Sequence, residues 1–397
     1  MKKVVLAYSG GLDTTFCIKY LSEELNMEVH TIFVDTFGVD RIYRMQLSKT
    51  AYAAGTKSCY YKDIRSEFYK KGIKNLIFGN VLKHNTYPLS VSSERTFQAM
   101  AVVDYANEIG ADILAHGCTG AGNDQIRFDL VWRVLAPEKQ IMSPVRDLNL
   151  SREKEIAYLK EKGVDLNFSK SEYSYNEGLW GSSIGGKETL DSNNFIPENA
   201  WLSKCENFGE QEINIEFKNG EAVALNGQMH NPIDLMQQLN EFGSNYAVGR
   251  GLHIGDTIVG LKGRIAFEAP AALILIKAHE LLEKHVLSKW QIQTKQGLSE
   301  KYGQLLHEGL YLDNACRDIE KYFESSQKRV SGNVKLKLKP YQFELIGVES
   351  PFDLHRTDFG EYGEGSKLWS SADVKGFIKL YSVPVQLQYM VDKINNI

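Results

Sequence analysis

The residues whose types suggest chemistry begin near the start of the chain, where a short apolar run ends in YSGGLDTT, residues 8–15. The two glycines allow a tight turn and let the backbone approach a ligand without an intervening Cβ. Free backbone N–H groups in such a turn, with the N-terminus of a helix behind them, favour a phosphate or pyrophosphate. The hydroxyls of Ser9, Thr14 and Thr15 add donors. A simple turn capped by Asp13 is the alternative, but the whole S-G-G-x-D-[ST] string favours the phosphate hypothesis.

A second group of polar side chains follows a later strand, in HGCTGAGNDQIR, residues 116–127. Its three glycines free a loop that carries Thr119, Asn123, Asp124 and Arg127. The guanidinium suits a carboxylate bidentately, the acid suits an ammonium, and the amide can both donate and accept. Together these groups would bind an amino acid. The alternative is a solvated glycine loop with a surface ion pair.

Two further motifs look like known sites but lack their essential residues. GSSIGGKE, residues 181–188, has the spacing of a Walker loop, but Glu188 replaces the Ser or Thr that ligates Mg²⁺ and no strand precedes it. A zinc-protease helix needs histidines four residues apart, whereas His279 and His285 are six apart. We therefore expect a buried or amphipathic helix around these histidines, and no metal site in the protein. Any metal would arrive with a nucleotide.

The elements that must position these motifs alternate between strand and helix over the first part of the chain. Strands are predicted at residues 3–8, 29–34, 112–115 and 141–144, and helices after the first glycine turn and at residues 97–109 and 151–162. This order predicts a parallel sheet with helices on both faces. Ligands of such sheets bind at the carboxyl ends of the strands, and both glycine-rich segments fall there.

The character of the chain changes near residue 167, where Ser, Asn, Gly and Trp become frequent. Strands are predicted afterwards at residues 213–217, 223–225, 257–261, 334–339, 343–348 and 377–381, and helices at residues 270–286 and from residue 384. We predict an α/β protein of three parts: a nucleotide-binding domain at residues 1–166, a mixed α/β synthetase domain at residues 167–369, and a C-terminal arm at residues 370–397 that reaches a neighbouring subunit.

Composition narrows the functional classes. The net charge of −4 argues against a broad nucleic-acid surface. The five scattered cysteines form no CxxC pair, which indicates reduced thiols. No apolar stretch reaches the roughly 18 residues of a membrane span, and the N-terminal apolar run is too short for a signal peptide. We expect a cytoplasmic protein without nucleic-acid or membrane partners.

Taken together, the motifs resemble a known family. SGGLDT is similar to the pyrophosphate-binding loop of the N-type ATP pyrophosphatases, which adenylate a substrate and have an adenine nucleotide α-hydrolase-like fold. HGCTGAGNDQIRF, TYPLSVSSER and YSYNEGLWGSSIGGKETL resemble the argininosuccinate synthases. LKGRIAFEAPAA, SSQKRVSGNVKLKL and GVESPFDL extend the resemblance over nearly the whole chain.

The resemblance implies a reaction and an assembly. ATP with Mg²⁺ would activate citrulline as a citrullyl-adenylate, and aspartate would then displace AMP to give argininosuccinate. The family is homotetrameric, and its C-terminal helix reaches across subunits.

The resemblance also implies roles for individual residues. ATP would contact Ala7, Tyr8, Ser9, Gly10, Gly11, Leu12, Asp13, Thr14, Thr15, Val34 and Gly117. Citrulline would contact Tyr87, Ser92, Asn123, Arg127, Ser174 and Ser183. Aspartate would contact Thr119, Asn123 and Asp124. Catalysis would rest on positioning, chiefly by Asp124 and Arg127.

Some positions depart from the family pattern. Ala121 stands where many members carry a lysine, so a cation near the nucleotide is lost. A glutamate and a tyrosine that touch citrulline in the family align with Gly255 and Phe267, and Asp256 is a candidate to replace the acid. These departures leave two rivals open. One is another enzyme with this loop, such as a tRNA thiouridylase or a glutamine-dependent synthetase; the other is a nucleotide-binding protein without turnover.

Overall fold

The computed structural model describes residues 1–164, 173–356, 358 and 368–395. The chain divides into two compact units, Met1–Ser350 and Pro351–Ile397. The predicted boundary between residues 166 and 167 lies outside the described residues.

The N-terminal part of the first unit is a parallel five-stranded sheet in the order β3-β2-β1-β4-β5. Its strands are β1 (Lys3–Ala7), β2 (Glu28–Asp35), β3 (Ser58–Asp63), β4 (Ile113–His116) and β5 (Gln140–Met142). Its longer helices are α1 (Leu12–Lys19), α2 (Arg41–Ala54), α5 (Ser90–Glu108), α6 (Asp124–Leu135) and α8 (Arg152–Glu161). Helices thus follow the strands as predicted, and the α/β fold class is confirmed.

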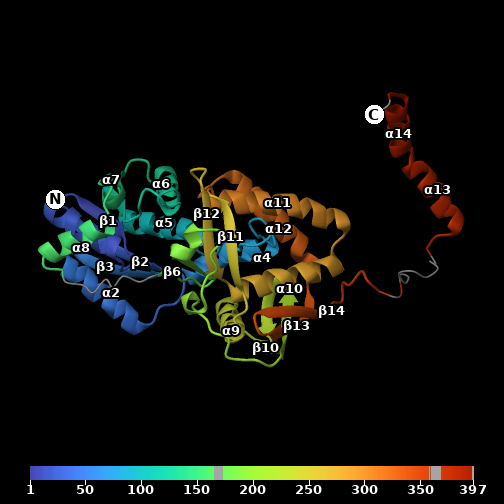
Figure 1. Cartoon of the computed structure of the whole chain (residues 1–397), viewed down its shortest axis with the longest axis horizontal. Helices are drawn as coiled ribbons and strands as arrows, with labels where there is room; N and C mark the ends of the chain where they lie inside the picture. The colour runs from blue at the N-terminus through green and yellow to red at the C-terminus, as the bar shows by residue number, and fades with distance from the viewer. Residues whose placement is uncertain (165–172, 357, 359–367, 396–397) are drawn as a thin grey trace. The chain divides into compact units, whose positions relative to one another are not determined.

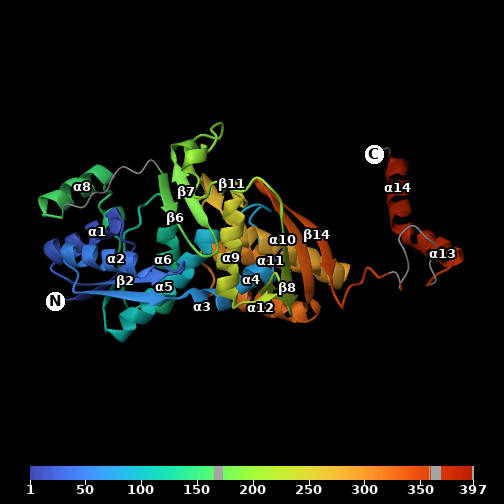
Figure 2. The ribbon, with the colours of Figure 1, turned by 90° about the horizontal axis from the view of Figure 1, so that it is seen from below.

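The alternation of side chains along β1 explains why both faces of this sheet are covered. Val4 and Leu6 belong to a core that α1, α2 and α8 complete, and Val5 belongs to a core that includes α5 and α6. Because neighbouring residues of a strand point to opposite faces, an all-apolar strand requires helices on both sides. Figure 2 shows α8 beside α1 on one of these faces.

The remainder of the first unit contains two antiparallel sheets and a group of helices. One sheet has the order β10-β9-β8-β13-β14, and the other has the order β11-β12-β7-β6. The strands are β6 (Tyr173–Asn176), β7 (Ser182–Gly186), β8 (Gln211–Lys218), β9 (Glu221–Leu225), β10 (Gln228–Met229), β11 (Arg250–Asp256), β12 (Lys262–Glu268), β13 (Gly332–Lys339) and β14 (Gln342–Glu349). The longer helices are α9 (Pro232–Asn245), α10 (Pro270–Val286), α11 (Lys289–His307) and α12 (Asn314–Ser326). Figure 1 shows β11 and β12 between the parallel sheet and helices α10 to α12.

Short helical segments connect these elements. They are η1 (Tyr20–Glu24), α3 (Arg65–Phe68), η2 (Tyr69–Ile73), α4 (Lys74–Phe78), α7 (Pro144–Asp147), η3 (Lys187–Leu190), η4 (Glu198–Ala200) and η5 (Gln327–Arg329). The second unit contributes α13 (Ser371–Tyr381) and α14 (Val383–Asn395).

Two predicted strands are wrong. Residues 377–381 lie in α13, which begins with a capping box between Ser370 and Asp373. Residues 257–261 form the turn that joins β11 to β12, where Gly260 has a φ of +90°. The other predicted strands and the helix at residues 270–286 are confirmed.

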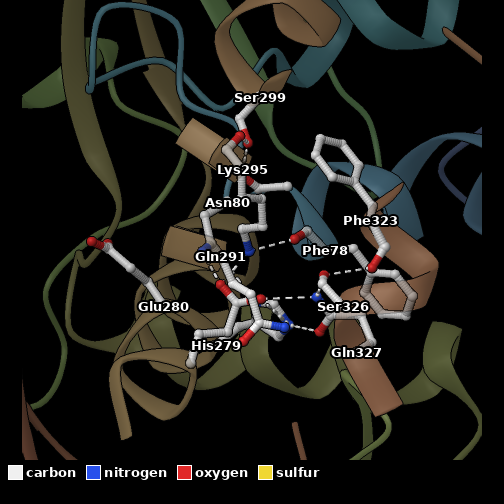
Figure 3. A network of polar contacts seen from close by, with 12 residues as sticks. Phe78, Asn80, His279, Glu280, Gln291, Lys295, Ser299, Phe323, Ser326 and Gln327 are labelled. Carbon is white, nitrogen blue, oxygen red and sulfur yellow. Dashed lines mark hydrogen bonds and ion pairs between the residues drawn. The ribbon is translucent and has the colours of Figure 1, made fainter. Parts of the chain in front are cut away.

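A buried polar network lies among α10, α11, η5 and the turn after α4 (Figure 3). Lys295 pairs with Glu283, and its Nζ also donates to the carbonyl of Phe78 at 2.6 Å. Asn80 and Gln327 each donate to the same carboxylate, at 2.7 and 2.8 Å. The network therefore ties the turn at residues 78–80 to the C-terminal helices.

Two further expectations concern thiols and membranes. All five cysteines are free, as predicted. None of the described helices is both long enough and apolar enough to span a bilayer.

Candidate active site

A cavity of about 1370 Å³ opens at the carboxyl ends of β1, β2 and β4. It brings together nearly all of the predicted site residues, although they come from widely separated segments. Those that line it are Ala7, Tyr8, Ser9, Gly10, Gly11, Leu12, Asp13, Thr14, Val34, Tyr87, Ser92, Gly117, Thr119, Asn123, Asp124, Arg127, Ser174 and Ser183. Thr15 lies outside the lining: its side chain is buried, and its hydroxyl donates to the carbonyl of Gly11 at 2.8 Å.

The first glycine turn forms one wall of this cavity. Gly10 has a φ of +83°, a conformation that L side chains rarely adopt. The N-cap of α1 is Gly11, and no side chain caps it, so Asp13 does not serve as the cap. The first N–H groups of the helix are therefore not used by a side-chain cap, which suits an anion.

The second glycine loop approaches the first closely. A Cβ added to Gly117 would lie 3.0 Å from the backbone nitrogen of Thr14. Only a residue without a side chain allows this distance without a shift in the neighbouring backbone. The close approach places the loop of residues 117–124 at the same cavity as the phosphate turn.

Asp124 lies at the start of α6 between two guanidinium groups. It accepts from Arg95 Nε at 2.9 Å and from Arg127 Nη1 at 2.6 Å. Burial alone would raise the pKa of this carboxyl, but the two arginines outweigh burial and lower the pKa to about 2. Asp124 is therefore ionised at neutral pH and is a poor proton acceptor.

Comparisons with known proteins support one family. The model of the arginosuccinate synthase N-terminal HUP domain matches residues 3–165, and that of the C-terminal domain of the same enzyme matches residues 173–388. The chain belongs to the argininosuccinate synthase family. It is 40% identical to the argininosuccinate synthase of Dictyoglomus turgidum, over 96% of each chain. It is 37% identical to that of Methanocaldococcus jannaschii, over 98% of each chain.

Argininosuccinate synthases are ATP-dependent ligases that join citrulline to aspartate, and the members just named align with this chain from the phosphate turn to the C-terminal helices. Against this family pattern, the positions of the three departures can be placed. Gly255 and Asp256 line the cavity, whereas Phe267 is buried behind Tyr87, with ring centroids 5.3 Å apart.

Sequence reasoning missed two histidines of the cavity. His253, on β11, stacks on Tyr87 with 5.4 Å between ring centroids. His307, at the end of α11, accepts through its carbonyl from Arg127 Nε at 2.8 Å. No motif marks either residue, because each reaches the cavity only through the tertiary fold. The signal available in the sequence was the pair of departures at Gly255 and Phe267.

The described residues contain no group of three or more His, Cys, Asp or Glu side chains that could hold a metal ion. Ala121 adds no cation to the loop beside the phosphate turn.

Proposed function

We propose that this chain makes argininosuccinate from citrulline, aspartate and ATP through a citrullyl-adenylate. The ureido oxygen of citrulline attacks the α-phosphorus, and the bond from that phosphorus to the bridging oxygen breaks as pyrophosphate leaves. The amine of aspartate then attacks the ureido carbon, loses a proton, and displaces AMP. The observation that carries this proposal is the single cavity lined by both the phosphate turn and the amino-acid-type loop.

The phosphate turn would hold the pyrophosphate that leaves. Its support is the uncapped N-terminus of α1 and the close approach of Gly117 to Thr14. Mg²⁺ would reach the site bound to the phosphates of ATP rather than in a site made of protein carboxylates. With Ala121 in the loop, the charge of the phosphates would be balanced by that ion and by backbone amides.

Asp124 and Arg127 would position the amino-acid substrates. Asp124 has a pKa near 2, so in this proposal it orients the amine of aspartate and does not take its proton. Asn123 uses its carbonyl oxygen to accept from the backbone of Ile258 at 2.9 Å, which leaves its amide NH₂ for a substrate. Tyr87, Ser92, Ser174 and Ser183 would complete the citrulline side of the cavity.

The C-terminal arm would complete a homotetramer in the cytoplasm. Helices α13 and α14 contain no buried residue, and they expose large apolar side chains, among them Phe377, Leu380, Leu387 and Met390. Exposed apolar surface of this kind is typical of an interface with another subunit. Sedimentation of the chain with and without residues 370–397 would test this assembly.

The reaction itself can be tested by pyrophosphate release. The purified chain is incubated with ATP, Mg²⁺, citrulline and aspartate, and pyrophosphate and argininosuccinate are measured. We expect pyrophosphate release that depends on citrulline, and argininosuccinate only when aspartate is also present. Absence of citrulline-dependent release would contradict the proposal and favour a nucleotide-binding protein without turnover.

A carboxyl pair beside the phosphate turn predicts a pH dependence. Burial and the neighbouring Asp13 together raise the pKa of Glu155 to about 8, and a side-chain hydrogen bond joins the two carboxyls. Stability that depends on protonated Glu155 is complete below its ordinary pKa of 4.5 and is lost as the pH rises through about 8. Above that pH, a second carboxylate would repel the phosphates of ATP.

We therefore expect the KM for ATP of the unaltered protein to rise several-fold between about pH 7 and pH 9. Glu155→Gln should flatten this rise, because its amide cannot ionise. The nearby exposed Glu153→Gln is the matched control and should keep the profile of the unaltered protein. The same profile in Glu155→Gln and in the unaltered protein would contradict the assignment.

A further inference from the structure

Two histidines that line the cavity each have a buried ring nitrogen without a partner. His253 is 6% exposed and His307 is 8% exposed. In both, Nε2 is shielded from water and makes no hydrogen bond. A buried polar atom without a partner is costly in a folded protein, so a substrate in the cavity is the natural source of the missing partner.

The partner of its other nitrogen fixes the tautomer of His307. Nδ1 of this ring lies 3.3 Å from Arg127 Nη2. A guanidinium can only donate, so Nδ1 accepts and the proton of the neutral ring sits on Nε2. His307 therefore offers an unused N–H donor.

The hydroxyl of Thr86 fixes the opposite tautomer in His253. Nδ1 of His253 lies 3.1 Å from Thr86 Oγ1, and that hydroxyl donates its only proton to the carbonyl of Lys83. The oxygen must then accept from Nδ1–H, which leaves Nε2 with a free lone pair. His253 therefore offers an unused acceptor.

Both rings are neutral in the folded protein. Burial, followed by the charge of Lys83, lowers the pKa of His253 to about 4. Burial and the cations Arg127 and Lys83 lower the pKa of His307 to about 2. The pair thus consists of one neutral donor and one neutral acceptor.

The carboxylates at this end of the cavity are already engaged. Asp124 is held by Arg95 and Arg127. Asp256 is exposed and pairs with Lys262 at 2.7 Å, so it is not a free substitute for a buried acid.

Gly255 shows that an acid at that position and His253 exclude one another. A Cβ at Gly255 would lie 2.7 Å from His253 Nε2, closer than real Cβ atoms approach. Any side chain at position 255 would require the imidazole to move. The glycine is therefore part of the arrangement that admits the histidine.

We propose that His253 and His307 are specificity residues that bind the amino-acid end of citrulline by one accepted and one donated hydrogen bond. His253 Nε2 accepts from the α-nitrogen, and His307 Nε2–H donates to the α-carboxylate. The pocket then recognises a donor at the α-position by hydrogen bonding instead of pairing its charge with a carboxylate. This inference rests on the proposed synthase function.

The test compares three substrates of similar size in the pyrophosphate assay. Citrulline has an α-ammonium, 2-hydroxy-5-ureidopentanoate has a neutral α-donor, and 5-ureidopentanoate has no donor there. For the unaltered protein, we expect kcat/KM for the hydroxy compound to stay within about tenfold of citrulline, and that for 5-ureidopentanoate to fall at least about tenfold further, because a hydrogen bond left unmade to a buried acceptor has that order of cost.

Variants separate the two histidines. His253→Ala should abolish the difference between the hydroxy compound and 5-ureidopentanoate. His307→Phe should raise KM for all three substrates alike, by about tenfold, with little change in kcat. The double variant His253→Ala, Gly255→Glu should restore an acid and favour citrulline over the hydroxy compound. His230→Ala, a histidine outside the cavity lining, is the control and should change none of these ratios.

The outcomes separate this inference from the function on which it rests. If citrulline supports pyrophosphate release but the hydroxy compound is rejected as strongly as 5-ureidopentanoate, the inference is overturned and the synthase function stands. The same holds if His253→Ala keeps the original substrate ratios. If citrulline supports no release at all, the proposed function fails first. Nitrogen-15 NMR of the two rings gives a readout independent of turnover, and a proton on Nε2 of His253 would also overturn the proposal.

Discussion

Lys295→Met is expected to lower the free energy of unfolding by about 3–5 kcal/mol, because removal of one partner leaves the other as an uncompensated buried charge. Lys295 and Glu283 are 3% and 2% exposed, so water cannot replace the lost ammonium. The carbonyl of Phe78 would lose its donor as well. Chemical denaturation monitored by circular dichroism would measure the change.

Two controls test whether burial of the charge is the cause. Lys284→Met removes an exposed lysine that pairs with Glu280, and such a change should cost no more than about 1 kcal/mol. The double variant Lys295→Met, Glu283→Leu should recover part of the loss, since no charge then stays buried. A single variant as stable as Lys284→Met would contradict the expectation, as would a double variant less stable than the single.

This network also shows where sequence reasoning stops. Asn80, Glu283, Lys295 and Gln327 lie in four segments, and each is an ordinary polar residue in its own segment. Only the packing of α10 and α11 against the turn after α4 joins them. The expectation that His279 belongs to a buried helix and not to a zinc site is confirmed, because it is buried on α10.

The phosphate turn could be predicted because its information is local. A buried strand, two glycines and a helix start within one short segment determine both the turn and its place at the edge of the sheet. The strand predicted at residues 377–381 failed because apolar residues in so short a run fit a strand or a helix equally well. The capping box at Ser370 was the local signal that decides for a helix.

The cavity was predicted in part. Its glycine loops and the residues between them were found, since each lies in a recognisable string. His253 and His307 were not, because β11 and the end of α11 meet only in the folded unit. The sequence did indicate that this end of the cavity had changed, through Gly255 and Phe267, without indicating which residues replace the missing contacts.

Asp124→Asn is expected to lower kcat/KM for aspartate by about 100-fold, the order of effect that a misplacement of about 1 Å can have on a positioned reaction. The asparagine has nearly the same shape, but it is neutral and offers only one carbonyl oxygen. It cannot accept from both Arg95 and Arg127, which the carboxylate holds at 2.9 and 2.6 Å. Steady-state kinetics with each substrate varied in turn would show the loss, and equilibrium binding of ATP should change less than about twofold, because the phosphate turn is intact.

The matched control for this prediction lies one turn and a half further along the same helix. Asp129 also holds two partners, His116 Nε2 and Arg146 Nη1, each at 3.0 Å, but it does not line the cavity. Asp129→Asn should therefore perturb stability more than the kinetics of aspartate, with a loss in kcat/KM below about tenfold. If both variants lost activity equally, the effect would come from the integrity of α6. If Asp124→Asn kept nearly normal turnover, Asp124 would not orient the amine, and the arginines alone would have to place the second substrate.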